Sequence, residues 1–175
     1  SKNMFSVLGR IFKTGCLTEK LPLHDQEVVQ LGAVCHKEIA RVFGKSLAIR
    51  MVDAGSCNGC ELEMHALNNS FYDIERFGIH FVASPRHADL LLVTGPVSRH
   101  MQAALKSTYD ATPDPKLVIA MGDCGADGGE FGISYASCGA VAGVIPVDAV
   151  IPGCPPTPLQ LLQGILELLG RRPGR

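Results

Sequence analysis

The chain has 175 residues, which is enough for one ordinary domain with a hydrophobic core. Hydrophobic residues make up 46% of it and charged residues 19%, a composition typical of globular domains and unlike that of disordered chains. A formal net charge of −1, an aromatic content of 6% and the absence of tryptophan argue against nucleic-acid binding, which needs a basic surface and aromatic side chains that stack on bases.

The first twenty residues differ from the rest of the chain. They contain no apolar core followed by a cleavage site and no twin-arginine pair, so we expect no export signal and a cytoplasmic protein. Phe5, Leu8 and Phe12 recur at helical spacing, which indicates an amphipathic arm that lies on a membrane or a partner, or that packs on its own domain. We therefore expect an N-terminal arm at residues 1–22 that contacts the membrane or partner subunits, and a single domain at residues 23–175.

A long helix is predicted next, over residues 26–41. Asp25 precedes it and offers an N-cap. The apolar residues that recur on one face of this pattern are Val28, Leu31, Val34 and Ile39. Cys35 lies within the pattern, and we expect it to pack as a small hydrophobic residue.

From residue 46 onward, short apolar runs alternate with helical patterns. The runs that predict buried strands are residues 46–52, 79–83, 90–94, 117–121 and 147–151, and the helical patterns are residues 61–68, 97–107 and 158–169. Strands that are apolar throughout and are separated by helices indicate a parallel sheet covered on both faces. The sequence therefore predicts an α/β fold, with a doubly wound, flavodoxin-like, mostly parallel sheet.

Seven cysteines are many for a cytoplasmic chain of this size, and they occur at positions 16, 35, 57, 60, 124, 138 and 154. In a reducing compartment, clustered cysteines indicate metal or redox chemistry rather than disulfides. Cys57 and Cys60 follow the first predicted strand, Cys124 follows the fourth and Cys154 follows the fifth. Because the carboxyl ends of parallel strands share one edge of the sheet, we expect these four thiols to converge there.

Thiolates are soft ligands, which select iron–sulfur clusters or zinc. Structural zinc sites usually use two close cysteine pairs, whereas Cys124 and Cys154 stand singly, and this difference favours an iron–sulfur cluster without excluding zinc. Cys138 lies fourteen positions beyond Cys124 and is a further candidate ligand, while Cys16 is expected to play no part. The chain has no Walker lysine motif and no dinucleotide fingerprint after the first strand, so we expect neither flavin nor nucleotide binding.

Five motifs occur in the order found in one known family. They are Cys57-Asn58-Gly59-Cys60-Glu61-Leu62-Glu63, Ser84-Pro85-Arg86-His87-Ala88-Asp89, Thr94-Gly95-Pro96-Val97, Gly122-Asp123-Cys124 and Pro152-Gly153-Cys154-Pro155-Pro156. Over about residues 47–169 the chain thus resembles the shared family of [NiFe]-hydrogenase small subunits and the 20 kDa cluster-bearing subunit of respiratory complex I. The resemblance implies one proximal [4Fe–4S] cluster held by Cys57, Cys60, Cys124 and Cys154. It also implies a large partner subunit that carries the nickel–iron site or part of a quinone cavity.

Two features of the sequence indicate which branch of this family the chain resembles. Complex I subunits typically have two adjacent cysteines in the first motif, whereas Cys57 and Cys60 are spaced as in hydrogenases. Uptake hydrogenases continue with further cluster ligands, but this chain ends about twenty residues after Cys154. It therefore resembles the energy-converting, formate-hydrogenlyase-like class, which is attached to the inner face of the cytoplasmic membrane through partner subunits.

The resemblance implies an electron-transfer subunit of an oxidoreductase complex. It would relay electrons through its one cluster to or from the nickel–iron site of the large subunit, for proton reduction or H2 oxidation. The expected partners are that large subunit, a ferredoxin-like iron–sulfur subunit and membrane-embedded complex I-like subunits. No catalytic residue is expected on this chain, because the nickel ligands would lie on the partner. The alternative is a cluster-bearing subunit of a complex I-like quinone oxidoreductase.

Several polar residues near these motifs allow more than one interpretation. Glu61 and Glu63 follow the cysteine pair, where they either favour the start of a helix by their charge or serve as a proton relay or a contact with the large subunit. His65 is interpreted as a packed or interfacial residue. Arg86 and His87 either hydrogen-bond a cluster sulfur or a subunit interface and tune the potential, or belong to a surface loop.

A glycine-rich segment follows Cys124 and carries two acidic residues. Asp127 and Glu130 stand in the run Gly125-Ala126-Asp127-Gly128-Gly129-Glu130. We expect both of them to lie in a solvated or interfacial loop.

Overall fold

The computed structural model describes residues 9, 13, 14 and 24–171. The predicted arm at residues 1–22 falls, apart from three residues, outside this part of the chain, as does Cys16. One parallel sheet organises the rest. Its strands are β1 (Leu47–Asp53), β2 (Ile79–Phe81), β3 (Leu90–Thr94), β4 (Leu117–Met121) and β5 (Ala149–Ile151), in the spatial order β2-β1-β3-β4-β5. This order confirms the doubly wound, flavodoxin-like α/β fold.

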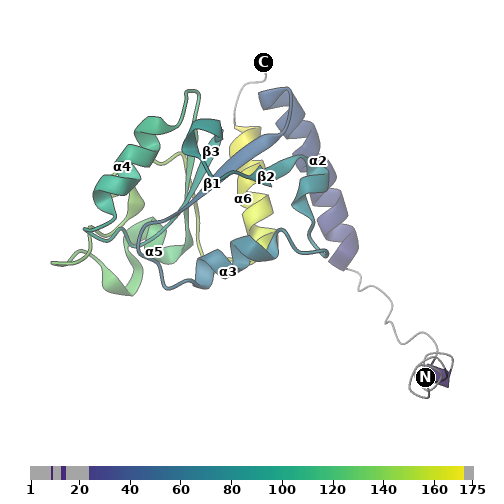
Figure 1. The fold of residues 1–175 in the computed structure, drawn as a ribbon, viewed down its shortest axis with the longest axis horizontal. Helices are drawn as coiled ribbons and strands as arrows, with labels where there is room; N and C mark the ends of the chain where they lie inside the picture. Colours follow the sequence, from purple (N-terminus) through teal and green to yellow (C-terminus); the bar gives the residue numbers. More distant parts are fainter. Residues whose placement is uncertain (1–8, 10–12, 15–23, 172–175) are drawn as a thin grey trace, which may run out of the picture.

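The central strands explain why the sheet needs cover on both faces. Every residue of β3 and of β4 is buried, so successive side chains enter apolar layers on opposite sides. Figure 1 shows helices on both sides of the sheet. The helices are α2 (His24–Phe43), α3 (Gly59–Ala66), α4 (Gln102–Ala111), α5 (Gly122–Asp127) and α6 (Pro158–Gly170). One apolar cluster joins one face of the sheet to α2, α3 and α6, and a second joins the other face to α4.

The predicted helix over residues 26–41 is confirmed, with differences in detail. Helix α2 begins at His24, so Asp25 lies within its first turn and does not cap it. Val34 was expected on the inner face, but its side chain is 47% exposed. The next residue, Cys35, is fully buried instead of Val34, which confirms that Cys35 packs as a small hydrophobic residue.

Helix α4 begins five residues later than the predicted start at residue 97. The chain first passes through a loop in which the amide of Val97 donates to the carbonyl oxygen of Gly139 at 2.9 Å, and the carbonyl oxygen of Val97 accepts from the amide of Cys138 at 2.7 Å. These bonds to a distant loop compete with helical hydrogen bonds and delay the helix. Helix α5 was not predicted, because its six residues are too few to show a helical apolar period.

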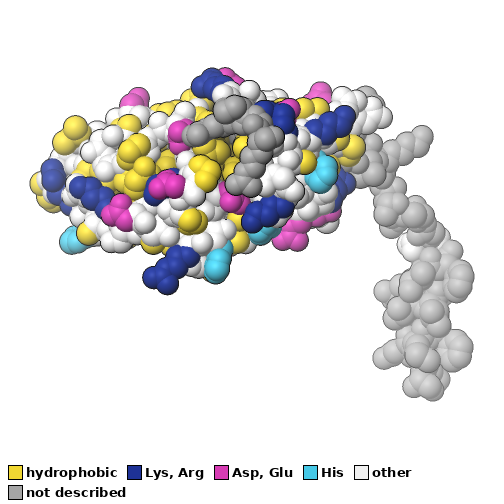
Figure 2. Space-filling model, turned by 90° about the horizontal axis from the view of Figure 1, so that it is seen from above, with side chains coloured by type: hydrophobic (Ala, Val, Ile, Leu, Met, Phe, Trp, Pro, Cys, Tyr) yellow, Lys and Arg dark blue, Asp and Glu magenta, His cyan; other side chains and the backbone are white. Residues whose placement is uncertain are grey.

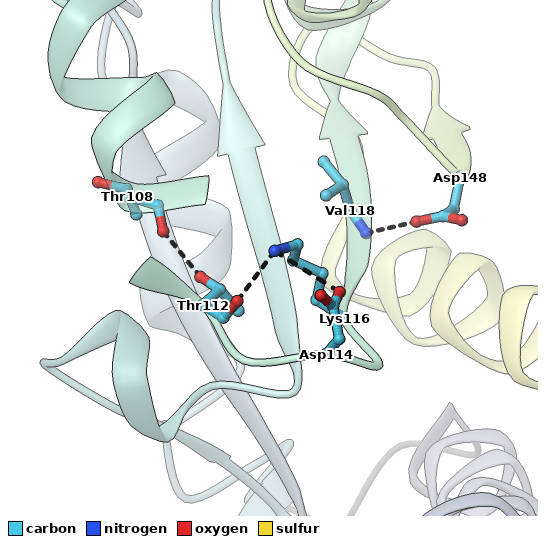
Figure 3. Close-up of polar contacts among 6 residues, drawn as sticks. All are labelled: Thr108, Thr112, Asp114, Lys116, Val118 and Asp148. Carbon is cyan, nitrogen blue, oxygen red and sulfur yellow. Dashed lines mark hydrogen bonds and ion pairs between the residues drawn. The ribbon is translucent and has the colours of Figure 1, made fainter. Parts of the chain in front are cut away.

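Two aspartates fasten the amino-terminal ends of neighbouring strands. Figure 3 shows Asp148, whose Oδ2 accepts from the amide of Val118 at 2.9 Å, while its own amide donates to the carbonyl oxygen of Val118 at 2.9 Å. Asp89 makes the same pair of bonds with Ala48, at 3.0 Å and 2.8 Å. The strand register is thereby fixed at one end of the sheet, and this fixes where the strands end at the other.

In the same region, Lys116 stabilises the loop that connects α4 to β4. Lys116 donates from Nζ to the carbonyl oxygen of Thr112 at 3.0 Å, as Figure 3 shows. Its ammonium group also lies 4.4 Å from the ring centroid of Tyr109. Within the described ranges, none of the helices combines the length and the apolar character that crossing a bilayer requires.

Candidate metal centre

The four cysteines lie where three strands end. Cys57 and Cys60 are in the connection from β1 into α3, Cys124 is in α5 directly after β4, and Cys154 is in the loop between β5 and α6. Figure 1 shows α3, α5 and the start of α6 together at the lower side of the sheet, where the strands end. Cys57 and Cys154 are exposed, Cys124 is half-buried and Cys60 is buried.

The thiols are close enough to influence one another electrostatically. Burial raises the pKa of the Cys60 thiol to about 12, and negative charge at Glu61, Cys57, Cys124 and Cys154 adds to the increase. Burial also raises the pKa of Cys124, with further contributions from Cys154 and Cys57. The structure therefore places the four thiols that the sequence singled out at one edge of the sheet, near enough for their charges to interact.

Two glycines allow the sulfur atoms this close approach. A Cβ atom on Gly122 would lie 2.8 Å from Sγ of Cys60, and one on Gly129 would lie 2.8 Å from Sγ of Cys124. Gly122 also has a φ of +80°, a conformation that L side chains rarely adopt. Gly122 therefore lets the thiol of Cys60 approach the strand end that carries Cys124.

Asp123 ties the loops of the two single cysteines together. Its Oδ1 accepts from the amide of Gly153 at 2.8 Å, and its own amide donates to the carbonyl oxygen of Gly153 at 2.9 Å. Asp123 precedes Cys124 and Gly153 precedes Cys154, so this reciprocal pair fixes the two thiols relative to each other. Asp123 stands in the motif Gly122-Asp123-Cys124, but the sequence predicts no role of its own for it.

Replacing Asp123 with alanine is expected to lower the free energy of unfolding by about 1–2 kcal/mol, because a charge-assisted hydrogen bond is lost. Urea unfolding of the cluster-free chain would measure this change. D123N is expected to retain most of the stability, since its amide oxygen can still accept from Gly153. Asp110→Ala, an exposed change on α4, is the control. Equal losses in D123A and D110A would contradict the role given to Asp123.

Glu61 connects the cysteine pair to the neighbouring strand β3. Its carboxylate accepts hydrogen bonds from Oγ of Ser56 at 2.5 Å and from Oγ1 of Thr94, which is fully buried at the end of β3. The Glu61 side chain lies in the first turn of α3, as the helix-start interpretation expected, and it also anchors the loop of Cys57 and Cys60. Thr94 was not singled out from the sequence, although a polar residue that ends an apolar strand is a signal for it.

Glu63 and His65 lie on the same helix, α3. Glu63 is half-buried. His65 is exposed, so the interpretation of it as a packed residue is wrong and the interfacial interpretation stays a prediction. Asp127 is the last residue of α5 and Glu130 lies in the short 3-10 helix that follows (Gly129–Phe131), so the expected loop is partly helical. Both residues are exposed, and the interfacial alternative stays a prediction.

The remaining described cysteines belong to the apolar cores. Burial raises the pKa of Cys35 to about 11, and its Sγ lies 3.8 Å from the carbonyl oxygen of Leu162 in α6. Cys138 packs against the cluster of buried residues between the sheet and α4. The backbone amide of Cys138 donates a hydrogen bond to the carbonyl oxygen of Val97, which holds Cys138 in that loop. The structure therefore assigns both residues to packing.

Arg86 and His87 lie at the opposite end of the sheet from the cysteines. They form a short 3-10 helix (Pro85–His87) that leads to Asp89, which is paired with Ala48 near the start of β1. Strand β1 ends at Asp53, which is five residues beyond Ala48 and roughly 17 Å away at the usual strand rise, and the cysteine pair lies beyond that end. A hydrogen bond from Arg86 or His87 to a cluster sulfur, which the sequence left open, is therefore excluded.

The residues present fit an iron–sulfur group by their donor chemistry. Within the part of the chain that the structure describes, no three or more His, Cys, Asp and Glu side chains are arranged to hold a single metal ion. Four sulfur donors nevertheless meet at one sheet edge, with glycines beside two of them. Soft donors and a close-lying backbone are what an iron–sulfur cluster requires.

Comparison with known proteins places this arrangement in context. The family described as "NADH ubiquinone oxidoreductase, 20 Kd subunit" matches residues 57–168. The chain is 44% identical over 146 residues to formate hydrogenlyase subunit 7 of Escherichia coli, covering 83% of this chain and 56% of that protein. The chain thus spans little more than half the length of this relative.

Two archaeal proteins are covered more completely. A probable membrane-bound hydrogenase subunit of Pyrococcus furiosus is 45% identical over 132 residues, covering 75% of this chain and 79% of that protein. Among solved structures, a chain of the membrane-bound sulfane sulfur reductase, described as an archaeal respiratory membrane complex, is 39% identical with a TM-score of 0.65. That similarity covers 78% of this chain and 74% of the other.

Proposed function

Because the chain belongs to the family of the 20 kDa subunit of NADH ubiquinone oxidoreductase, we propose that it relays electrons through one [4Fe–4S] cluster in a membrane-bound hydrogenase complex of the formate-hydrogenlyase type. Members of this family are subunits of hydrogenase and complex I-like oxidoreductases and carry an iron–sulfur cluster. We propose in addition that this chain holds a single cluster, that four of its cysteines ligate that cluster, and that the cluster serves a hydrogenase reaction.

The observation that carries the proposal is the meeting of four thiols at one sheet edge. Cys57, Cys60, Cys124 and Cys154 would hold the cluster, which supplies one-electron transfer when bound. Burial of Cys60 keeps water from one side of the group, whereas exposure of Cys57 and Cys154 leaves another side open to a partner. Glu61 and Asp123 hold the loops in place, so that the ligands need little rearrangement when an electron is gained or lost.

The same edge offers a surface for the partner that carries the active site. Phe131, Ile133 and Tyr135 follow α5, and their side chains are 62%, 80% and 96% exposed. Exposed large apolar side chains beside a redox centre are expected where another subunit packs. The proposed partners are the hydrogenase large subunit at this edge, a ferredoxin-like iron–sulfur subunit and membrane subunits, with the chain attached peripherally on the cytoplasmic side.

Metal analysis and electron paramagnetic resonance of the full chain, purified without oxygen, would test the cluster. We expect iron and sulfide in equal amounts and a signal of a reduced [4Fe–4S] cluster that appears on reduction with dithionite. Zinc in place of iron, or iron without a reducible signal, would overturn the redox function and favour the structural zinc site that the sequence left open.

One observation supports a second candidate function. The solved neighbour with 39% identity belongs to a sulfane sulfur reductase, so the same kind of subunit also serves a complex with another terminal acceptor. The purified complex would distinguish the two possibilities. We expect H2 evolution with reduced viologen and nickel in the large subunit. Reduction of polysulfide or quinone by a complex without nickel would replace the hydrogenase assignment and leave the electron relay intact.

A further inference from the structure

A cationic hollow lies at the end of the sheet opposite the cysteines. It encloses about 320 Å³ between the start of β1, strand β2 and the 3-10 helix before β3. The residues with basic side chains that line it are Lys45, His80, Arg86 and His87. Figure 2 views the molecule from this end, and Lys, Arg and His side chains lie along its lower border together with Asp and Glu side chains. No part of the proposed electron relay uses this region.

Within the described part of the chain, the basic groups of the hollow, Lys45 and Arg86 among them, form no ion pair. The one carboxylate that lines the hollow belongs to Asp89, and its Oδ2 already accepts from the amide of Ala48 at 3.0 Å. Cations gathered in one concave place repel one another, so an anion that enters the hollow would be favoured.

Arg50 lies on β1, the strand whose start borders the hollow. It lies two residues beyond Ala48 on β1, and because side chains alternate along a strand it shares the face that carries Ala48. Its Nε atom is buried and has no hydrogen-bond partner within the described part of the chain. A buried donor without an acceptor is costly, but Arg50 is not among the residues that line the hollow, so it is the lining residues themselves that favour a bound anion.

Phosphate is the anion whose chemistry fits these donors. The guanidinium of Arg86 presents a planar fork suited to phosphate oxygens, Lys45 supplies a compact charge, and Ser46 adds a hydroxyl at the wall. The hollow is larger than a phosphate alone needs, and Val82 and Pro113 form apolar parts of its wall. A phosphate that carries an organic group is therefore favoured over a small inorganic anion.

We propose that the hollow formed by Lys45, Ser46, His80, Arg86 and His87 binds a phosphate group, presented by the headgroup of an anionic phospholipid. The relatives named above belong to membrane-bound complexes, and basic residues near an anionic membrane surface gather such headgroups. The hollow faces away from the sheet edge where the cysteines meet, so a lipid there would not compete with the partner at that edge. The inference does not depend on the cluster.

Vesicle co-sedimentation of the full chain would test the inference. Vesicles of phosphatidylcholine with phosphatidylglycerol are expected to bind the wild-type chain, and K45E/R86E is expected to bind them about tenfold or more weakly. The control, K37E/K106E, makes the same charge change with exposed lysines on α2 and α4, and we expect its binding within about twofold of wild type. Circular dichroism would show that both variants fold, and K45A/R86A would replace K45E/R86E if it does not.

Titration with inorganic phosphate separates the two sources of the ligand. Loss of phosphate binding in K45E/R86E together with unchanged vesicle binding would assign the hollow to a free phosphate compound and overturn the lipid source. Equal losses in K45E/R86E and K37E/K106E would show only a general charge effect and overturn the site. Absence of binding to both probes by the wild-type chain would also overturn it.

Discussion

Replacing Gly122 with alanine is expected to lower the free energy of unfolding by about 2–5 kcal/mol. The new Cβ atom would lie 2.8 Å from Sγ of Cys60, closer than Cβ atoms approach sulfur in folded proteins. A φ of +80° adds the strain of a left-handed conformation. Cys60 cannot move away easily, because its side chain is buried and its neighbour Glu61 is fastened to Thr94. Urea unfolding of the cluster-free chain would measure the loss.

A matched control separates the contact from the backbone strain. Gly44 has a φ of +70°, but a Cβ atom there would meet nothing within 4 Å. Gly44→Ala is therefore expected to cost only the conformational part, about 1–2 kcal/mol. If G122A is no less stable than G44A, then Sγ of Cys60 does not lie against Gly122, and the geometry proposed for the cluster ligands is wrong.

Replacing Cys124 with alanine is expected to abolish the [4Fe–4S] signal of the reduced chain. In the proposed ligand set Cys124 would supply one of four sulfur donors, and the structure places no other described cysteine beside the remaining three, since Cys35 and Cys138 are packed into the apolar cores. The loss of a ligand leaves one iron without protein sulfur, which destabilises the whole group. Electron paramagnetic resonance and iron content per chain would measure the effect after anaerobic reconstitution.

Cys138→Ala is the control for that experiment. It makes the same chemical change fourteen residues later, at a half-buried side chain, and is expected to leave the iron content and the signal unchanged. Its stability should fall by no more than about 1 kcal/mol, because only a small side chain is removed. A full signal in C124A, or loss of the signal in C138A, would require a different set of four ligands.

The fold was largely predictable because its elements are strongly patterned. The runs at residues 90–94 and 117–121 were predicted with the bounds that β3 and β4 have, since every residue of the two strands except Thr94 is apolar and a glycine follows each strand. The ends of the shorter strands were predicted less accurately. The predicted strand at residues 79–83 ends at Phe81, because the chain turns there toward the 3-10 helix.

The sequence predictions that the structure corrects failed because they depend on contacts between distant segments of the chain. Residues 97–101 have a helical pattern, but Val97 pairs with a loop forty residues later in the sequence, and a local pattern cannot show such a bond. Arg86 and His87 were considered as neighbours of the cluster because they follow β2 in the chain. Strand β2 is short and lies beside the first half of β1, so they belong to the other end of the sheet.

The sequence by itself determined the parallel α/β fold and the expectation of four cysteines at one sheet edge, because apolar periodicity and the succession of strands and helices along the chain can be read locally. Only the tertiary structure showed what holds those thiols in place. The contact of Gly122 with Cys60, the bonds between Asp123 and Gly153, and the support of Glu61 by Thr94 each join separate strand ends. Such contacts depend on strand order and register, which exist only once the sheet has formed. The cationic hollow likewise gathers residues from four segments at the sheet's other end.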